Sequence, residues 1–558
     1  MKKFSLLFRV LAIVLACMLV LASCDMGGAN NTEDDEETST EHVHKFGSWE
    51  IVRDATEEKD GVKERYCDCG EVQKKNYSLS SGNNNEHATN DSENDDVDSD
   101  NNPTYGGDKV RYDAIPEEGY DGSEVTIVFY HTMGQNLRAV LDKYIEEFNK
   151  LYPNITVVHS QVGGYDDLYE KTCLDLAQGN APNIVYCYPE HVAVYNMTSA
   201  VVPLDNFIES KIPVTDAYGN TTVLGFTDEQ RNDFIPGYYA EGTAFDEAGT
   251  MYSLPMSKST EVLYYNKTFF EANGISVPAT WSEMEEVCKR ILEIDPNCIP
   301  LGHDSESNLF ITMCEQLGTP YISTTDSEHF IFDTAENRDF MKMFSQWYVN
   351  GYFTTQQIYG AYTSGLFVAQ SGIKSYMNIG SSAGATHHRP TANYPGGYPF
   401  EVGIAMIPQA DPSNPKVISQ GPSLCIFDQE NKQEVVASWL FMEFLTTNSN
   451  FQAEFSLSSG YMPVIESALE HPVYQNFLSY ADGGDYIAAL AIKMGLEQSD
   501  AYFKIPIFNG TAIANDQVRH LVQDCLIQCS LSGDSSDFDR VVKKAFEDAV
   551  SVCKFLYS

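Results

Sequence analysis

From Val125 onward, the hydrophobic positions alternate between two periods. Short apolar runs rich in β-branched residues predict strands at 125–129, 155–158 and 184–188. Between these runs, apolar residues recur every three to four positions, which predicts helices over 137–152 and 165–177. Strands that alternate with helices are typical of a βαβ architecture with a mostly parallel sheet.

The alternation continues through the rest of the chain. Thr280 and Glu283 have the spacing of a capping box, which predicts a helix that runs through Ile294. Further strands are predicted at 402–406 and 424–427, and further helices at 435–445 and 516–527. Segment 121–558 is longer than a single hydrophobic core usually supports, so we expect two lobes. Ligands of open α/β sheets lie at the carboxyl ends of the strands, and two facing lobes would enclose them in a cleft.

The first residues follow a different pattern. Basic residues precede the apolar run 10–22, which is shorter than the roughly 20 residues of a membrane-spanning helix and is typical of a signal peptide. The run ends in Leu21-Ala22-Ser23-Cys24, which resembles the lipobox of bacterial lipoproteins. This resemblance implies that 1–24 is a lipoprotein signal peptide and that a lipid on Cys24 anchors the chain to the extracytoplasmic face of the cell membrane. An ordinary signal peptide is the alternative.

Composition identifies the segments between the leader and the body. The chain holds 80 Asp and Glu against 35 Lys and Arg, a formal net charge of −45. This balance argues against a nucleic-acid partner, because phosphate binding needs clustered Lys and Arg. Residues 25–41 and 77–120 contain few apolar side chains, so they are predicted to be an acidic tether and an acidic linker.

Residues 42–76 differ from both acidic segments. They begin with an H-x-F-x-x-W pattern, end near a Cys-Gly-Glu run, and resemble a small cysteine-containing module of bacterial surface proteins. His42, His44, Cys67 and Cys69 are candidate zinc ligands, but the C-x-C spacing is tighter than the usual C-x₂₋₄-C. We therefore prefer a small β-module without metal and expect no cofactor.

Four motifs in the body resemble the extracellular solute-binding proteins of carbohydrate ABC importers. They are Gly179-Asn-Ala-Pro-Asn-Ile-Val-Tyr186, the run from Leu254 to Asn266, Pro278-Ala-Thr-Trp281-Ser-Glu283 and Ser459-Gly-Tyr-Met-Pro463. They occur in the family's order across about 124–550. The resemblance implies a type II periplasmic-binding-protein-like fold over 121–558, with two lobes of mostly parallel sheets flanked by helices. It also implies a ligand cleft between the lobes, delivery of the ligand to the transmembrane subunits of an ABC permease, and a monomeric protein.

A narrower resemblance concerns the branch that binds glycerol 3-phosphate and its diesters. Phe129–Met133, Pro236–Tyr239 and Gly421–Leu424 carry it. In that branch an aromatic residue in the second loop and an acid after the third strand bind the ligand, and they match Tyr165 and Glu190. The other candidate ligand contacts, taken from matching motifs or from predicted strand ends, are Tyr130, His131, Tyr188, Ser259, Thr260, Ser381, Ser382, Gly421 and Tyr461.

Two departures argue against glycerol phosphate as the ligand. The branch places an Arg near the late loop, whereas 503–510 contains Lys504 and no Arg, and a Lys cannot reproduce a planar bidentate fork. The branch also has Trp residues where this chain has Gly302-His-Asp-Ser305. A neutral sugar or oligosaccharide is preferred, because aromatic rings cover its C–H face and carboxylates accept from its hydroxyls.

Each candidate also has a purely structural interpretation. Glu190 is suited to cap the helix that follows it, Tyr461 to pack beneath a turn, and His131 to lie in the core. Acidic pairs suited to glycoside hydrolysis follow from composition alone, and the chain has no H-E-x-x-H, G-x-S-x-G or Walker A motif. We therefore predict a binding protein rather than an enzyme. An anchored glycan-degrading enzyme and a surface sugar sensor or adhesin are the alternatives from other classes.

Overall fold

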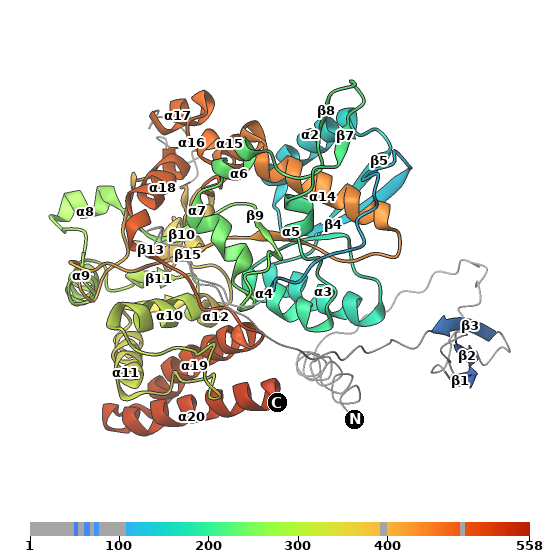
Figure 1. Cartoon of the computed structure of the whole chain (residues 1–558). Coiled ribbons are helices and arrows are strands. Elements are labelled where there is room, and N and C mark those ends of the chain that lie inside the picture. The colour runs from blue at the N-terminus through green and yellow to red at the C-terminus, as the bar shows by residue number, and fades with distance from the viewer. Residues whose placement is uncertain (1–49, 54–60, 67–71, 78–107, 391–398, 480–485) are drawn as a thin grey trace, which may run out of the picture. The chain divides into compact units, whose positions relative to one another are not determined.

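The computed structural model describes residues 50–53, 61–66, 72–77, 108–390, 399–479 and 486–558. These belong to two compact units, one within 22–104 and one that contains the body from 105 to 558 (Figure 1). Cys24, His42, His44, Cys67 and Cys69 lie outside the described residues. The lipid anchor and the zinc site therefore remain predictions.

The smaller unit contains a three-stranded antiparallel sheet. Its strands are β1 (Glu50–Arg53), β2 (Gly61–Tyr66) and β3 (Val72–Tyr77), in that order. β2 and β3 pair from Tyr66 with Val72 to Gly61 with Tyr77, so they form a hairpin.

A five-stranded sheet forms the centre of the first lobe. Its order is β5 (Ile155–Gln161), β4 (Val125–His131), β6 (Ile184–Cys187), β16 (Ser423–Ile426) and β9 (Leu254–Pro255). The first three strands are parallel, whereas β16 and β9 come from later chain segments. Residues 423–426 pair antiparallel with β6, so this lobe is built from chain segments far apart in the sequence.

Alternation along these strands sends side chains to two separate layers of helices. Phe129, Ile184 and Leu424 pack on one side with the helices α2 (Gln135–Leu151), α14 (Lys432–Thr447) and α15 (Ser449–Leu457). Val185 and Cys425 pack on the other side with α3 (Tyr165–Gln178) and α4 (Pro189–Tyr195). A hairpin and short helices complete the lobe: β7 (Pro213–Thr215), β8 (Thr221–Val223), α5 (Asp205–Ile208), α6 (Asp228–Asp233), α7 (Pro236–Tyr239), α16 (Glu466–Leu469) and α17 (Pro472–Ser479).

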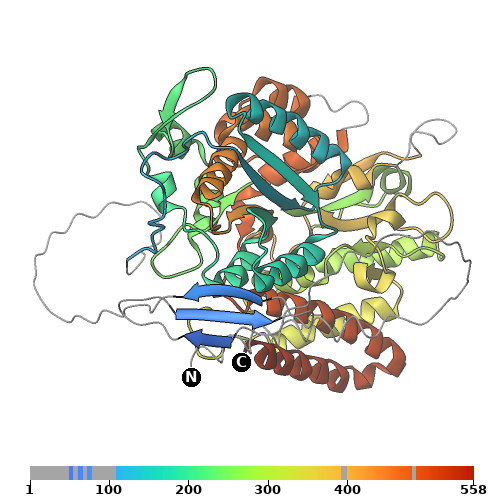
Figure 2. The ribbon, with the colours of Figure 1, turned by 90° about the vertical axis from the view of Figure 1, so that its right-hand side faces the viewer.

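A seven-stranded sheet forms the second lobe. Its order is β12 (Phe353–Thr355), β11 (Leu301–His303), β13 (Met377–Ser381), β10 (Ser259–Asn266), β15 (Val417–Gln420) and β17 (Tyr502–Phe503), with β14 (Val402–Ala405) also on β10. Its helices are α8 (Lys267–Asn273), α9 (Trp281–Ile294), α10 (Glu306–Leu317), α11 (Ala335–Val349), α12 (Gln356–Tyr359), α13 (Ser364–Phe367), α18 (Tyr486–Glu497), α19 (Thr511–Ser532) and α20 (Phe538–Tyr557). Helices α19 and α20 lie side by side in both views (Figures 1 and 2).

The predicted elements agree closely with the structure. The capping box is present: Thr280 Oγ1 accepts from the backbone N–H of Glu283 at 3.2 Å, and α9 ends at Ile294 as the pattern predicts. The two-lobed α/β fold is confirmed, and its sheets, predicted to be mostly parallel, combine parallel and antiparallel pairs. β10 pairs antiparallel with β13, β14 and β15, because it enters the second lobe from the crossover rather than after a helix.

Three chain segments cross between the lobes side by side. Lys258 pairs with Met462 through two backbone hydrogen bonds, of 2.9 and 2.6 Å, and Met256 N–H donates to the carbonyl of Pro422 at 3.0 Å. Gly421 has φ +135°, and a Cβ there would lie 2.4 Å from the carbonyl oxygen of Ser257. Only glycine allows the crossing strands to approach this closely.

Candidate ligand cleft

Three of the predicted tyrosines meet at the edge of the first lobe. Tyr165 begins α3 and Tyr188 follows β6, and their rings stack with centroids 4.2 Å apart. Tyr186, on β6 itself, stacks against Tyr165 at 6.0 Å. The hydroxyl of Tyr165 lies 3.2 Å from that of Tyr461, in the loop after α15. Burial raises the pKa of all four phenols, so at neutral pH they keep their protons and can donate as well as accept.

Glu190 lies beside this cluster in the first turn of α4. Its Oε1 accepts a hydrogen bond of 3.3 Å from the amide of Asn515, which belongs to α19 of the second lobe. Burial raises the pKa of this carboxyl group to about 7, although its own backbone N–H, Lys258 and Asn515 favour the charged form. A contact with the other lobe goes beyond helix capping, which was the structural interpretation of Glu190.

Other interlobe contacts surround the tyrosines. Asp166, the residue after Tyr165, forms a 2.6 Å ion pair with Arg519 of α19. Lys504, just after β17, donates to the carbonyl oxygen of Gly237 in the first lobe.

His131 and Tyr130 do not join the cluster. The ring of His131 is fully buried, accepts from the backbone N–H of Met133 at 3.1 Å and lies 2.8 Å from His159. Alternation along β4 places it on the same face as Phe129, towards the core, and burial lowers its pKa to about 4. Tyr130 faces the opposite layer, where Lys171 lies 4.9 Å from the centre of its ring.

The predicted serines and threonine form backbone contacts near the crossover. Ser382 Oγ accepts from the backbone N–H of Thr260 at 3.3 Å, and Thr260 Oγ1 donates to the carbonyl of Ile418 at 2.9 Å. Ser381 Oγ caps the short helix η3 (Ser382–His388) by accepting from Ala383. Ser259 is buried in β10, opposite Gln420. Together with Gly421, these residues build the joint between the lobes.

The structure also brings together polar residues that the sequence analysis missed. Asn308, at the start of α10, donates to Glu261 at 3.0 Å and to Gln420 at 2.9 Å. Tyr321 donates to Asn515 at 2.6 Å, so Asn515 connects Tyr321 to Glu190. Glu261 follows the Ser259-Thr260 pair directly, which is a local signal. Tyr321 and Asn515 are almost 200 residues apart, and no sequence pattern connects them.

Two cations near the tyrosines, Lys258 and Arg519, are paired with carboxylates. Lys258, which is 1% exposed, pairs with Glu241 of the first lobe, and Tyr238 presents its ring 5.6 Å from the same ammonium group. Arg519 pairs with Asp166. The charges of these two pairs cancel, whereas the ammonium group of Lys504 contacts a backbone carbonyl oxygen.

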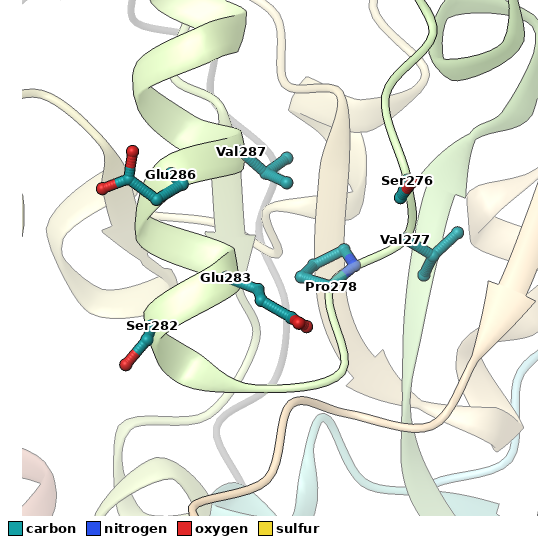
Figure 3. Close-up of a pocket in the computed structure, with 7 residues that line it drawn as sticks. All are labelled: Ser276, Val277, Pro278, Ser282, Glu283, Glu286 and Val287. Atoms are coloured by element: carbon teal, nitrogen blue, oxygen red, sulfur yellow. The ribbon is translucent and has the colours of Figure 1, made fainter.

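A separate surface depression lies on the second lobe, away from the crossover (Figure 3). Its volume is about 420 Å³, and it lies between α9 and the loop before that helix, lined by Ser276, Val277, Pro278, Ser282, Glu283, Glu286 and Val287. Figure 3 shows Glu283 pointing towards this loop, where its carboxylate accepts from the backbone N–H groups of Ala279 and Thr280. This carboxylate is occupied by helix capping, so we do not assign the ligand here.

Neither a candidate metal site nor a membrane-spanning helix is found among the described residues. Those residues contain no group of three or more His, Cys, Asp and Glu side chains that could hold a metal ion. Over the same ranges, no helix is both long and apolar enough to cross a membrane. No disulfide bond joins any two of the nine cysteines that these ranges contain.

The sequence of the body is similar to known binding proteins. Residues 143–478 match the family model described as bacterial extracellular solute-binding protein. The sn-glycerol-3-phosphate-binding periplasmic protein UgpB of Escherichia coli O1:K1 is 24% identical over 415 residues, which cover 72% of this chain and 86% of the relative. The narrower resemblance to the glycerol-3-phosphate-binding branch is thereby confirmed.

Solved structures show the same fold. UgpB from Mycobacterium tuberculosis, in complex with glycerophosphocholine, has a TM-score of 0.58 and 17% identity, covering 78% of this chain and 98% of that one. Maltose-bound MalE3 of T. maritima has a TM-score of 0.59 and 15% identity, covering 76% and 99%. These relatives are binding proteins, and the family model matches most of the chain, so the prediction of a binding protein rather than an enzyme is confirmed. The chain belongs to the bacterial extracellular solute-binding proteins.

Proposed function

We propose that this protein captures a neutral sugar or oligosaccharide and delivers it to the transmembrane subunits of an ABC permease. The observation that carries this proposal is the stacked pair Tyr165 and Tyr188 with Glu190 and Tyr461 beside it. Stacked phenol rings offer a surface for the C–H face of a sugar, and the carboxyl and hydroxyl groups next to them can bond its hydroxyls. Tyr165, Tyr188, Glu190 and Tyr461 are the proposed ligand contacts.

The local charge supports a neutral ligand over glycerol 3-phosphate or its diesters. UgpB of E. coli bears the name of a glycerol-3-phosphate-binding protein, but in this chain Lys258 and Arg519 are paired with carboxylates. A phosphate would have to compete with Glu241 or Asp166 for a cation. Lys504 is the remaining candidate, and it would contact a phosphate as a point charge, without the bidentate geometry of an Arg.

The domain organisation belongs to the same proposal. Residues 1–24 serve as a lipoprotein signal peptide with Cys24 lipidated, 25–41 as a tether, 42–76 as a small module, 77–120 as a linker and 121–558 as the binding body. The protein then acts as a monomer on the extracytoplasmic face of the membrane. Incorporation of a labelled fatty acid that Cys24→Ala abolishes would support the anchor, and unchanged labelling would contradict it.

Thermal unfolding with a ligand panel tests the binding proposal. The panel contains glucose, maltose, maltotriose, sn-glycerol 3-phosphate and glycerophosphocholine. A ligand that binds only the folded chain stabilises it by about 2.7 kcal/mol at a hundredfold excess over its dissociation constant. We expect a rise in Tm with a neutral sugar that Tyr188→Ala and Glu190→Gln abolish.

Glu286→Gln is the matched control for Glu190→Gln. It also removes a carboxylate charge, but in the surface depression of Figure 3, where 73% of the Glu286 side chain is exposed. The control should keep the full response to the sugar. A rise in Tm with only the two phosphate compounds would contradict the neutral ligand, and loss of the sugar response in Glu286→Gln would move the site to that depression.

A further inference from the structure

We infer that Asn515 and Tyr321 of the second lobe are positioning residues for Glu190, which hold its carboxyl group in place for the ligand only while the lobes are together. The inference rests on the proposed function in taking Glu190 as a ligand contact. Its structural part, a polar relay from one lobe to a carboxyl group of the other, stands independently of which ligand binds.

The relay consists of two hydrogen bonds in sequence. The hydroxyl of Tyr321 donates to Oδ1 of Asn515 at 2.6 Å, and Nδ2 of Asn515 donates to Oε1 of Glu190 at 3.3 Å. When Glu190 is ionised, its oxygens can only accept, so the amide nitrogen of Asn515 faces Glu190 and the amide oxygen accepts from Tyr321. Each group therefore determines the orientation of the next.

Both second-lobe residues are held firmly by the fold. The ring of Tyr321 is 7% exposed and packs beside Phe310 and Phe332 in the core of that lobe. Asn515 lies in the N-terminal part of α19, one turn before Arg519, which forms the ion pair with Asp166. The same face of α19 thus contacts the first lobe at two positions, and separating the lobes breaks both contacts.

Glu190 is sensitive to this relay because it has few other charged neighbours. The titratable groups that interact with it are Lys258, Glu241, Tyr188, Tyr321 and Cys187. Burial favours the protonated carboxyl group, whereas Lys258 and the Asn515 amide favour the carboxylate. Loss of the amide donor should therefore leave Glu190 protonated to a higher pH and reduce its strength as an acceptor for ligand hydroxyls.

The pH dependence of stability tests the relay without any ligand. The free energy of unfolding in urea is measured from pH 5 to pH 9 for the full-length protein and for its Glu190→Gln variant. At each pH, the difference between the two free energies is the contribution of Glu190 to stability. The folded pKa, about 7, is above the unfolded value, so this contribution should decrease from about pH 4.5 and become constant above about pH 7. In Asn515→Leu, and to a smaller extent in Tyr321→Phe, we expect the decrease to continue to higher pH.

Tyr376→Phe is the matched control, because it removes a second-lobe tyrosine hydroxyl that donates to Asp295 and not to the relay. It should leave the Glu190-dependent profile unchanged. The inference is overturned if Asn515→Leu and Tyr321→Phe give the control's profile, or if Glu190→Gln alone does not alter the pH dependence. A general loss of stability in any variant cancels, because each variant is compared with the same variant that also carries Glu190→Gln.

A second arm measures the affinity for maltotriose. Loss of a hydrogen bond to a charged group should weaken binding about tenfold in Asn515→Leu, with no change in Tyr376→Phe. Absence of maltotriose binding in every variant, including the unmodified protein, would count against the proposed function, while the ligand-free profile would still decide the relay. Unchanged maltotriose affinity in Asn515→Leu would overturn the positioning role.

Discussion

Asp166 and Arg519 join the two lobes through an ion pair of 2.6 Å. Asp166 directly follows Tyr165 in α3, and Arg519 lies on α19. Asp166 therefore lies next to the tyrosine cluster of the first lobe, and Arg519 belongs to the second lobe. A contact of this kind stabilises the arrangement in which the two lobes meet.

Replacement of Arg519 by Met should favour separation of the lobes. The Asp166 side chain is 69% exposed, so solvent screens the pair and its contribution is small. We expect the Arg519→Met variant to bind sugar no more than severalfold more weakly. We also expect small-angle scattering to give this variant a larger radius of gyration. High salt should reduce the difference from the unmodified protein. Lys342→Met, which removes ion pairs to Asp339 and Asp539 within the second lobe, should change neither measurement.

The backbone at Gly421 should not tolerate a side chain. A Cβ there meets the Ser257 carbonyl oxygen at 2.4 Å and Cα of Lys258 at 2.8 Å, and φ is +135°. We expect Gly421→Ala to lower the free energy of unfolding by about 3 kcal/mol or more, because strain and overpacking add. Gly360→Ala is the comparison, since φ is +80° but a Cβ there meets no atom within 4 Å, and it should cost about 1 kcal/mol. Equal losses in urea unfolding would show that the close approach does not matter.

The buried pair Lys258 and Glu241 should be strongly coupled. Their side chains are 1% and 7% exposed, so Lys258→Met leaves an uncompensated carboxylate in the interior. We expect a loss of about 3–5 kcal/mol in urea unfolding at pH 7. The double variant Lys258→Met, Glu241→Leu should recover much of this loss, because both charges are then absent. If the two substitutions add independently, the pair is not coupled.

His131 should make the protein less stable in acid. Its folded pKa is about 4, below the roughly 6.5 of an unfolded chain. Between these values the unfolded chain binds a proton that the folded chain does not, so stability falls as pH decreases from about 6.5 to 4. His131→Asn should remove about 2–3 kcal/mol of this acid-dependent loss in urea unfolding. His520→Asn, at a histidine whose side chain is 54% exposed, is the control for replacing a histidine outside the core. A steep profile retained in His131→Asn would contradict the assignment.

The order of the local elements could be predicted from hydrophobic periodicity alone. The helix from Trp281 to Ile294 and the helix that begins at Tyr165 agree with the predicted starts, because capping and amphipathic spacing depend on neighbouring residues. The mixed strand directions were not predictable in this way. β16 joins the first-lobe sheet more than 230 residues after β6, and sequence period does not report strand direction.

For the candidate site, the sequence by itself identified the tyrosines that meet, Tyr165, Tyr188 and Tyr461, and the acid Glu190 beside them, since strand ends and family motifs locate loops. Only the tertiary structure distinguished these residues from His131 and Gly421. The side chain of His131 faces the core because side chains alternate along β4, and position 421 must be glycine because the backbone of Ser257 lies so close. It alone brought Asn515 and Tyr321 to Glu190. The physical reason is that contacts between lobes depend on how distant segments pack, and no local period or spacing encodes that packing.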